Sequence, residues 1–377
     1  MKLFECQNCG QPLYFENTRC ESCGLSLGYL PAGESVSALR PDRTMWVALA
    51  DPRGNYRYCA NAAHGACNWL ISAESPEQFC VACRHNRMIP DLDQPETLGH
   101  WRRIEIAKHR LFYSLLRFRL SAKTKAEAPD GLAFDFLADI PATSPGTTPV
   151  MTGHANGVIT INIAEADDAE RERRRRQMGE PYRTLLGHFR HEIAHYYWGR
   201  LVASTARLDE FRQIFGDERA EYDQALQGYY KSGAPADWPE HFITGYATAH
   251  PWEDFAETWA HYFHMVDTLE TAAWFGLVVA PKVSKGVAAR IDFDPYKADM
   301  DRLIEAWIPL TFAANSMNRS MGIPDLYPFV LGPPVIAKLT FVHACIHAPA
   351  RQKTTMNSSL RAMIAGLRRR TGIATQP

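Results

Sequence analysis

The stretch HFRHEIAHYYW, residues 188–198, sets two histidines and a glutamate into an apolar pattern of helical period. Apolar residues recur at steps of three and four from just upstream of it: Leu186, Phe189, Ile193 and Tyr197. This spacing predicts a helix with one stripe facing a core. His191 and His195 project from consecutive turns, so both imidazoles can reach one metal ion while Glu192 stands beside them. The alternative is a core helix whose two histidines bind no metal.

A second helix is expected downstream, in ITGYATAHPWEDFAETWAHYFHM. Its aromatic residues form a helical stripe: Phe255, Trp259 and Tyr262 or Phe263. Glu253 and Glu257 then lie one turn apart on another face and point the same way. A catalytic zinc needs three protein ligands and an open position, so one carboxylate can complete the set while the other holds a ligand histidine by its free N–H. An acidic pair on an exposed face is the other interpretation. Three nearby histidines are further candidates for the third ligand: His250, His261 and His264.

Eight of the nine cysteines lie in the first quarter of the chain. The first four form the pattern C-x2-C-x10-C-x2-C: Cys6, Cys9, Cys20 and Cys23. Gly10 and Gly24 follow the two pairs and let the backbone turn tightly beneath a metal. Four thiolates from two short loops are the tetrahedral ligand set of a structural zinc. Disulfides are the alternative, which a reducing compartment disfavours.

The next four cysteines form a less regular pattern, C-x7-C-x12-C-x2-C: Cys59, Cys67, Cys80 and Cys83. This set ends in the same C-x2-C knuckle and predicts a second structural zinc. His64 and His85 lie close to it and could replace one sulfur ligand, although four cysteines already complete a site. Cys345 stands alone near the end of the chain and is expected to be a buried apolar residue.

The charge balance gives no reason to expect nucleic acid as a partner. The 377 residues carry a formal net charge of −1. Residues 1–95 hold eight Lys/Arg against ten Asp/Glu, a net of −2, whereas a nucleic-acid-binding zinc module is usually basic. The run Ala169–Pro181 is the most basic in the chain. Acidic residues flank and interrupt this run, which favours a solvated, self-compensating helix face.

The N-terminus and the hydropathy pattern bear on the compartment. MKLFECQNCG places a charge and a cysteine where a signal peptide needs an apolar run. An uninterrupted apolar run of membrane-spanning length does not occur in the sequence. We therefore expect a cytoplasmic enzyme or binding protein with no membrane partner.

Composition changes near Pro90, where a polar, proline-containing linker precedes residues of helical spacing. A chain of this length exceeds the usual size of one core, so two or more domains are expected. We predict a double zinc-binding module at residues 1–92 and a second domain, mainly helical with a small sheet, at residues 93–377. Residues 136–157 are rich in Pro, Gly, Ser and Thr and predict a loop, and GVITINIA, residues 157–164, predicts a half-buried strand.

The C-terminal third predicts helices interrupted at Pro309 and Pro324. Four aromatic residues there are expected in the core: Trp307, Phe312, Tyr327 and Phe329.

Four segments together resemble a known family: MKLFECQNCGQPLYFEN, YRYCANAAHGACNW, GEPYRTLLGHFRHEIAHYYW and HPWEDFAETWAHYFHM. They are similar to the bacterial zinc-binding metallopeptidases that carry an N-terminal zinc ribbon, and the similarity covers nearly the whole chain. More distantly, HEIAH followed by Tyr246 and E-x-x-x-E resembles the gluzincins, including the lethal-factor type. The resemblance implies an α+β fold, with a zincin-like metallopeptidase domain behind a cysteine-rich zinc-ribbon module.

The roles of individual residues follow from this resemblance. In gluzincins the first acid of the E-x-x-x-E/D helix is the glutamate ligand, and a tyrosine lies shortly before it. Carried over, the resemblance implies three ligands of a catalytic zinc: His191, His195 and Glu253. It also implies Glu192 as general base, Glu257 as the partner of a ligand and Tyr246 as donor to the oxyanion. Zincins pair extended substrate with an edge strand upstream of the active helix. GVITINIA is the candidate for that edge strand, although a core strand fits its sequence equally.

These observations predict zinc-dependent hydrolysis of peptide bonds in a peptide or protein, by a metal-activated water with Glu192 as general base. Three zinc ions are expected, one catalytic and two structural. Two other hypotheses stay open. In one, the zinc ribbon directs the protease to nucleic acid, against its acidic balance. In the other, the zinc sites only hold the fold of a non-catalytic scaffold.

Overall fold

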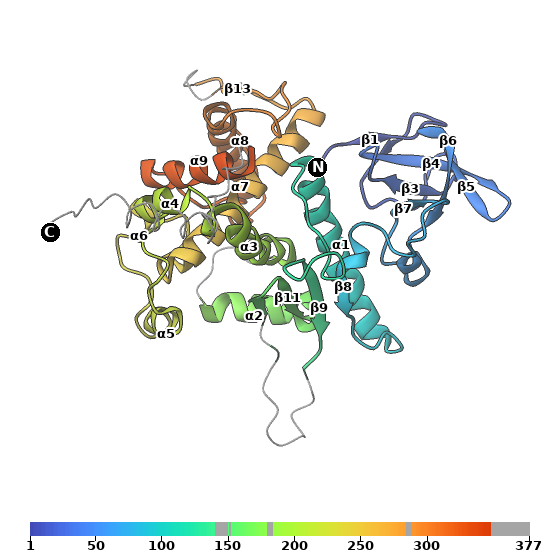
Figure 1. Ribbon diagram of the computed structural model, residues 1–377. Coiled ribbons are helices and arrows are strands. Elements are labelled where there is room, and N and C mark those ends of the chain that lie inside the picture. The colour runs from blue at the N-terminus through green and yellow to red at the C-terminus, as the bar shows by residue number, and fades with distance from the viewer. Residues whose placement is uncertain (140–149, 151, 179–183, 284–287, 348–377) are drawn as a thin grey trace, which may run out of the picture.

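The computed structural model describes residues 1–139, 150, 152–178, 184–283 and 288–347. Small sheets dominate the N-terminal part and helices the remainder, which confirms the α+β class. Figure 1 shows the strand-rich N-terminal part, in blue, on one side of helix α1 (Pro95–Arg117) and the helical body on the other. Among the described helices, none combines the length and the apolar character needed to cross a bilayer.

The N-terminal part contains a short hairpin and a rolled sheet. The hairpin pairs β1 (Phe4–Glu5) with β2 (Pro12–Leu13). Five antiparallel strands follow in sequence order: β3 (Leu27–Leu30), β4 (Ser35–Asp42), β5 (Met45–Ala48), β6 (Asp51–Tyr58) and β7 (Leu70–Ser72). A bridge between Tyr29 and Trp69 brings the first strand of this sheet to its last, so the sheet curls around buried aromatic rings.

Helix α1 joins this module to the rest of the molecule. It begins with a proline in its first turn, where the missing N–H costs nothing. The Tyr113 ring of α1 lies 5.3 Å from that of Phe15 and 6.3 Å from that of Tyr29, between ring centroids. Buried residues of the module and of the helical body therefore belong to one continuous apolar core.

A second sheet has the strand order β10-β11-β9-β8. Its strands are β8 (Asn86–Met88), β9 (Ala133–Leu137), β10 (Gly153–Ala155) and β11 (Val158–Asn162). The predicted strand GVITINIA forms β11, but β11 is interior, parallel to β9 and antiparallel to β10. Its proposed position at the edge of the sheet is wrong.

The edge strand is β10, inside the stretch that was expected to be a loop. Asn156 and Gly157 connect β10 to β11, and both have positive φ, 49° and 79°. Two such residues make the tight turn whose twist matches that of the flanking strands. The Asn-Gly pair is therefore the local signal for this hairpin, and composition alone concealed it.

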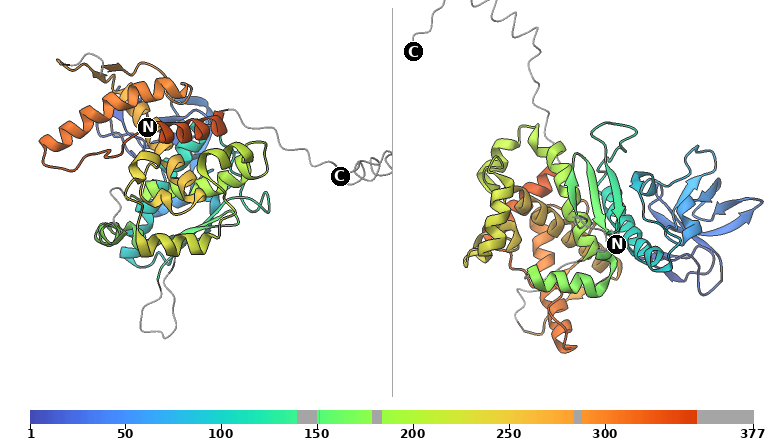
Figure 2. Two further views of the ribbon diagram at one scale, coloured as in Figure 1. Left: turned by 90° about the vertical axis from the view of Figure 1, so that its left-hand side faces the viewer. Right: turned by 90° about the horizontal axis from the view of Figure 1, so that it is seen from below.

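Eight helices make up the rest of the described body (Figure 2): α2 (Asp168–Met178), α3 (Leu185–Trp198), α4 (Leu208–Phe215), α5 (Tyr222–Ser232), α6 (Trp238–His241), α7 (Pro251–Trp274), α8 (Met300–Ser320) and α9 (Pro333–His347). A small hairpin pairs β12 (Val278–Val279) with β13 (Ala289–Arg290). Helix α7 is central, because α3, α4, α8 and α9 all pack on it. Helix α2 contains most of the basic run, and its Arg173 pairs with Glu170 as a self-compensating face requires. Residues 179–183 lie outside the described part.

The C-terminal third corrects two expectations. Helix α8 continues through Pro309, which is itself buried, so the predicted interruption there is wrong. Leu303, Trp307 and Leu310 anchor the helix to the core on both sides of this proline, which offsets the lost backbone hydrogen bond. Phe312 is 62% exposed and is not a core residue, because it falls on the outer face of α8. Tyr327 is buried, as are Trp307 and Cys345, as expected.

Candidate metal centres

The start of helix α3 fixes the direction of its histidines. Thr184 caps the helix, because its Oγ1 accepts a hydrogen bond of 2.9 Å from the backbone N–H of Gly187. The predicted apolar stripe is confirmed, since Phe189, Ile193 and Tyr197 are all buried. The ring of Tyr197 stacks on Trp259 of α7 at 5.3 Å between centroids. This contact turns the histidine face of α3 toward the first turns of α7.

The start of α7 presents its two glutamates to that face. His250 caps the helix by accepting a hydrogen bond from the N–H of Trp252 on its Nδ1, and Pro251 occupies the first turn. Glu253 and Glu257 follow one turn apart, as the spacing predicted. Phe255, on the opposite stripe, is fully buried in the core.

His191, His195 and Glu253 come together between α3 and α7. Nε2 of His191 lies 3.0 Å from Oε2 of Glu253, and Nε2 of His195 lies 3.6 Å from its Oε1. One ligand atom from each of the three residues lies within 4.8 Å of the others. Two imidazole nitrogens and one carboxylate oxygen are the donor set of catalytic zinc sites that keep a fourth position open. The residues therefore fit a zinc ion.

Glu257 contacts the side of His191 that faces away from this group. Its Oε1 lies 2.7 Å from Nδ1 of His191, and its Oε2 accepts a hydrogen bond of 2.8 Å from the hydroxyl of Thr244. An Nδ1–H that donates to a carboxylate leaves Nε2 with its lone pair toward a metal and fixes the ring orientation. Thr244 is a partner that the sequence did not reveal.

The charges of this group depend on one another. Burial lowers the pKa of His191, but its hydrogen bonds to Glu253 and Glu257 outweigh burial and raise the pKa well above its ordinary value. Burial raises the pKa of Glu253, but the nearby His195 and His191 reverse this and hold it far below its usual range. Glu253 is therefore a carboxylate and able to bind a cation.

Glu192 lies beside the group and is buried. Burial raises the pKa of its carboxyl, and the charge of His191 partly opposes this effect. Glu165 and His188 also lie in its surroundings, with Nδ1 of His188 3.0 Å from Oε2 of Glu165. Glu192 therefore places a buried carboxyl directly beside the metal-binding group.

Two tyrosines flank Glu253. The ring of Tyr246, expected from the family resemblance, lies 6.0 Å from that of His191 between centroids. Tyr222, at the start of α5, donates a hydrogen bond of 2.7 Å from its hydroxyl to Oε1 of Glu253. Sequence reasoning missed Tyr222, because it lies 31 residues before its partner on a different helix.

The edge strand β10 lies next to the group formed by His191, His195 and Glu253. The ring of its His154 lies nearly parallel to that of His195, at 6.2 Å between centroids. Nε2 of His154 accepts a hydrogen bond of 3.1 Å from the N–H of Gly157. The β10 edge of the four-stranded sheet therefore runs beside the metal-binding group.

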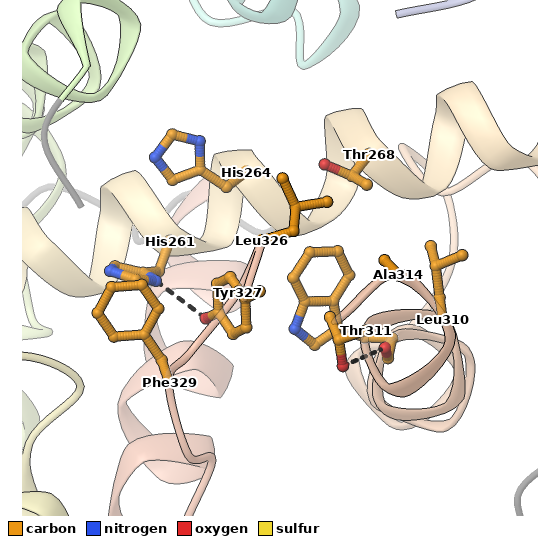
Figure 3. A pocket seen from close by; sticks show the side chains of 10 residues that line it. His261, His264, Thr268, Leu310, Thr311, Ala314, Leu326, Tyr327 and Phe329 are labelled. Carbon is orange, nitrogen blue, oxygen red and sulfur yellow. Dashed lines mark hydrogen bonds between the residues drawn. The ribbon is translucent and has the colours of Figure 1, made fainter. Parts of the chain in front are cut away.

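The three alternative histidines contact other partners. Nε2 of His250 lies 3.1 Å from the carbonyl oxygen of Ala220. His261 and His264 line a cavity of about 100 Å³ between α7 and α8 (Figure 3). There Nδ1 of His261 lies 2.9 Å from the hydroxyl of Tyr327, while His264 contacts Arg190.

The first four cysteines form a compact group, two in the turn between β1 and β2 and two in the segment that follows β2. Sγ of Cys6 lies 3.7 Å from that of Cys23, and Sγ of Cys9 lies 3.6 Å from that of Cys20. Gly10 and Gly24 have φ of +75° and +76°, the left-handed conformation that their turns require. All nine cysteines of the chain lie in the described part, and all are free of disulfides.

The second four cysteines are also grouped, and all four are buried. His64 and His85, the expected substitutes for a sulfur, do not face them. His64 lies at the surface, and the two ring nitrogens of His85 lie against the carbonyl oxygens of Val81 and Ala122. The histidine that does face the sulfurs is His109 of α1, with Nε2 3.2 Å from Sγ of Cys67.

Comparisons with known proteins identify a zinc-binding family and a zinc ribbon. Residues 97–345 match the model of a protein family described as "Putative zinc-binding metallo-peptidase", and residues 3–94 match a zinc-ribbon domain. Uncharacterized proteins of Mycobacterium bovis and Mycobacterium tuberculosis are each 42% identical to the chain over 348 residues. The match covers 92% of this chain and 95% of each relative. No solved structure matches the chain.

Proposed function

The chain belongs to this family of zinc-binding metallopeptidases, and from that premise we propose that it is a gluzincin-like peptidase. Its expected substrate is a peptide or protein of the cytoplasm. The observation that carries the proposal is the convergence of His191, His195 and Glu253, with Glu192 beside them. A zinc site that only stabilises the fold would need the three ligands but would not need a buried carboxyl of raised pKa next to them.

His191, His195 and Glu253 would hold the catalytic zinc, and Glu257 would orient His191. A zinc ion bound there lowers the pKa of a water molecule and polarises a carbonyl group. Glu192 would accept the proton of the attacking water and later deliver it to the leaving amine. Its buried position suits this role, since a raised pKa brings a carboxyl closer to neutral pH.

The tyrosines would act on either side of the reacting carbonyl. Tyr246, with its ring next to His191, would donate to the oxygen that gains negative charge. Tyr222 would have a different task, because its hydroxyl already donates to Glu253. That hydrogen bond would stabilise the charged form of the carboxylate and fix its orientation.

Strand β10 would select peptides over other amides. It is the antiparallel edge of its sheet, and its His154 lies beside His195. An extended peptide that pairs with this edge would be held by backbone hydrogen bonds along its length. Such pairing recognises the peptide backbone more than its side chains, so broad side-chain tolerance is expected.

Replacement of Glu192 tests the chemistry. We expect Glu192→Gln to keep the zinc content and the melting temperature while it abolishes cleavage of a peptide library, because an amide cannot accept the proton. The two side chains have nearly the same volume, so packing should not change. Glu165→Gln is the matched control, since it alters a buried carboxyl near Glu192 that binds no metal in this scheme.

Wild-type cleavage by Glu192→Gln would contradict the role of general base. Loss of one zinc ion in that variant would make the glutamate a ligand. Absence of any cleavage by the fully metallated wild type would leave the non-catalytic scaffold as the function.

A further inference from the structure

The second cysteine group contains more metal donors than one zinc ion needs. Three sulfur atoms lie close to Nε2 of His109: Cys67 at 3.2 Å, Cys83 at 3.5 Å and Cys80 at 3.9 Å. The sulfurs of Cys67 and Cys80 are themselves 3.8 Å apart. Ligands of a tetrahedral zinc, about 2.3 Å from the metal for sulfur, lie about 3.8 Å from one another. His109 is therefore as close to these sulfurs as a fellow ligand would be.

The other ring nitrogen of His109 is anchored in the manner of a metal ligand. Nδ1 lies 2.6 Å from the carbonyl oxygen of Glu105, one turn earlier in α1. A carbonyl oxygen only accepts hydrogen bonds, so Nδ1 carries the proton in this contact. In the neutral ring, Nε2 then holds a lone pair that points at the sulfurs. Histidine ligands of metals are commonly fixed by such a bond.

We propose that His109 binds the second metal ion together with Cys67, Cys80 and Cys83, in place of Cys59. The resulting site is Cys3His, and it takes ligands from the zinc ribbon and from the first helix of the peptidase part. Metal binding would thereby fasten α1 to the strand-rich N-terminal part that lies beside it (Figure 1).

The spacing of the cysteines agrees with this assignment. The first group has a C-x2-C knuckle at each end, whereas the second has one knuckle, Cys80 and Cys83, and two cysteines seven residues apart. The sulfur of Cys59 is grouped with the other three and accepts a hydrogen bond of 3.3 Å from the N–H of Cys80, whereas His109 contacts the sulfurs of the other three cysteines. Three sulfurs are thus common to both possible ligand sets, and Cys59 and His109 compete for the fourth position.

The two possible ligand sets differ in the charge on the metal site itself. Four thiolates around a zinc ion leave two net negative charges, whereas three thiolates and a neutral imidazole leave one. The carboxylate of Glu105 is fully buried beside the site, 3.5 Å from Sγ of Cys83. Its charge is balanced by Lys108, whose Nζ lies 2.6 Å from Oε1 of Glu105. Burial lowers the pKa of His109, but the neighbouring Cys83 outweighs burial and raises it, so in a four-sulfur site a charged His109 would offset the second negative charge. The two ligand sets therefore bury the same net charge, and the choice between them depends on geometry.

Two single substitutions distinguish the ligand sets in the full-length protein. His109→Asn keeps an amide that can still donate to the Glu105 carbonyl but cannot reach the sulfurs. We expect it to release one zinc ion at least about 100-fold faster than the wild type under a competing chromophoric chelator, since loss of a ligand should exceed the 10–100-fold effect of a supporting residue. His85→Asn, in the other buried histidine near this knuckle, is the control and should release zinc as the wild type does.

Cys59→Ser provides the second arm, and it does not depend on the folding of the His109 variant. We expect this variant to keep the full zinc content of the wild type. In the cobalt-substituted protein, the difference spectrum between wild type and His109→Asn should show the loss of a nitrogen ligand from a site with three sulfurs. The proposal is overturned if Cys59→Ser loses one zinc ion, or if His109→Asn keeps the wild-type release rate and cobalt spectrum.

Discussion

Glu253 and Glu257 stand one turn apart on α7 yet touch different atoms of His191. Glu253 faces Nε2 and also His195, whereas Glu257 faces Nδ1 and Thr244. We therefore expect Glu253→Ala to empty the catalytic site at chelator concentrations that leave the cysteine sites filled. Glu257→Ala should weaken zinc binding by roughly 10–100-fold and leave a site that excess zinc refills. Zinc titration with a fluorescent indicator measures both, and the reverse ranking would exchange the two roles.

The hydroxyls of Tyr222 and Tyr246 should likewise separate in their effects. Tyr246→Phe is expected to keep zinc affinity and to lower turnover by 10²–10³, about 3 kcal/mol, if the hydroxyl serves the oxyanion. Tyr222→Phe removes a hydrogen bond to Glu253 and should act first on zinc affinity. Steady-state kinetics at saturating zinc, beside the zinc titration, distinguishes them. Equal loss of turnover in both variants, with unchanged zinc affinity, would assign the oxyanion role to both tyrosines.

At the scale of residues, the sequence located what a single helix determines. The spacing within HEIAH and within E-x-x-x-E placed four side chains on two helical faces, and the structure brings these faces together. Tyr222, Thr244 and His109 were missed, because each meets its partner through packing between different segments, which are 13 residues apart for Thr244 and farther apart for the other two. Local spacing carries no information about such meetings.

Helix α7 carries functional candidates on one face and a buried histidine, His261, on another. The burial of His261 predicts how the stability of the protein depends on pH. His261, one turn after Glu257, is buried against the cavity shown in Figure 3. Burial lowers the pKa of its ring from 6.5 to about 4, although the charge of Glu257 opposes this. The folded state therefore binds this proton less readily than the unfolded chain does. The associated stability is complete above pH 6.5 and declines as the pH falls toward 4.

Between pH 7 and pH 5 the wild type should lose about 2 kcal/mol of stability through His261 alone. His261→Asn keeps a polar atom near Tyr327 but cannot gain this proton, so its melting temperature should fall less over the same interval. Exposed His64 offers the control, and His64→Asn should follow the wild-type curve. Parallel curves for wild type and His261→Asn would show that the buried ring does not resist protonation.

At the scale of elements, periodicity worked where one face of the element is buried. The helices α1, α3 and α7 and the strand β11 were predicted because apolar residues recur at their period. Strand β10 was not predicted, because three residues are too few to show an alternating pattern. Only the turn formed by Asn156 and Gly157 indicates it. The prediction of a helix end at Pro309 was wrong although the local signal is clear. Packing of α8 on both sides of the proline outweighs a local preference that the sequence does show.

For the whole molecule, we predict three zinc ions that leave in a fixed order. The proposed catalytic site would keep an open position, and its histidines are 12% and 17% exposed, so a chelator should reach it first. The second cysteine group is buried and should lose zinc last. Elemental analysis during chelation should show the first ion leaving with little change in melting temperature, and a large fall only when the cysteine sites empty. One zinc ion or fewer in the native protein would contradict the scheme.

The N-terminal cysteine-rich part and the helical part are joined by a strand pairing and by a common apolar core, in addition to the linker. Strand β8, which begins three residues after Cys83, pairs with β9 of the second sheet, and one apolar core includes buried residues from both sides of α1. The change of composition near Pro90 indicates a boundary between two kinds of sequence. It gives no sign that β8, which precedes Pro90, pairs with β9, which follows it. Sheet pairing between distant segments is fixed by the fold as a whole.

Because His109 follows the four cysteines in the sequence, the ligands of the second metal site become available in a fixed order during synthesis of the nascent chain. All four cysteines of the second group leave the ribosome before residue 109 does, so a metal captured at that stage has only sulfur ligands, Cys59 among them. Helix α1 follows and docks, since N-terminal parts fold first during translation. Our ligand assignment then requires the captured ion to exchange Cys59 for His109. Cys59 would thus serve as a provisional ligand that keeps the metal until the helix arrives.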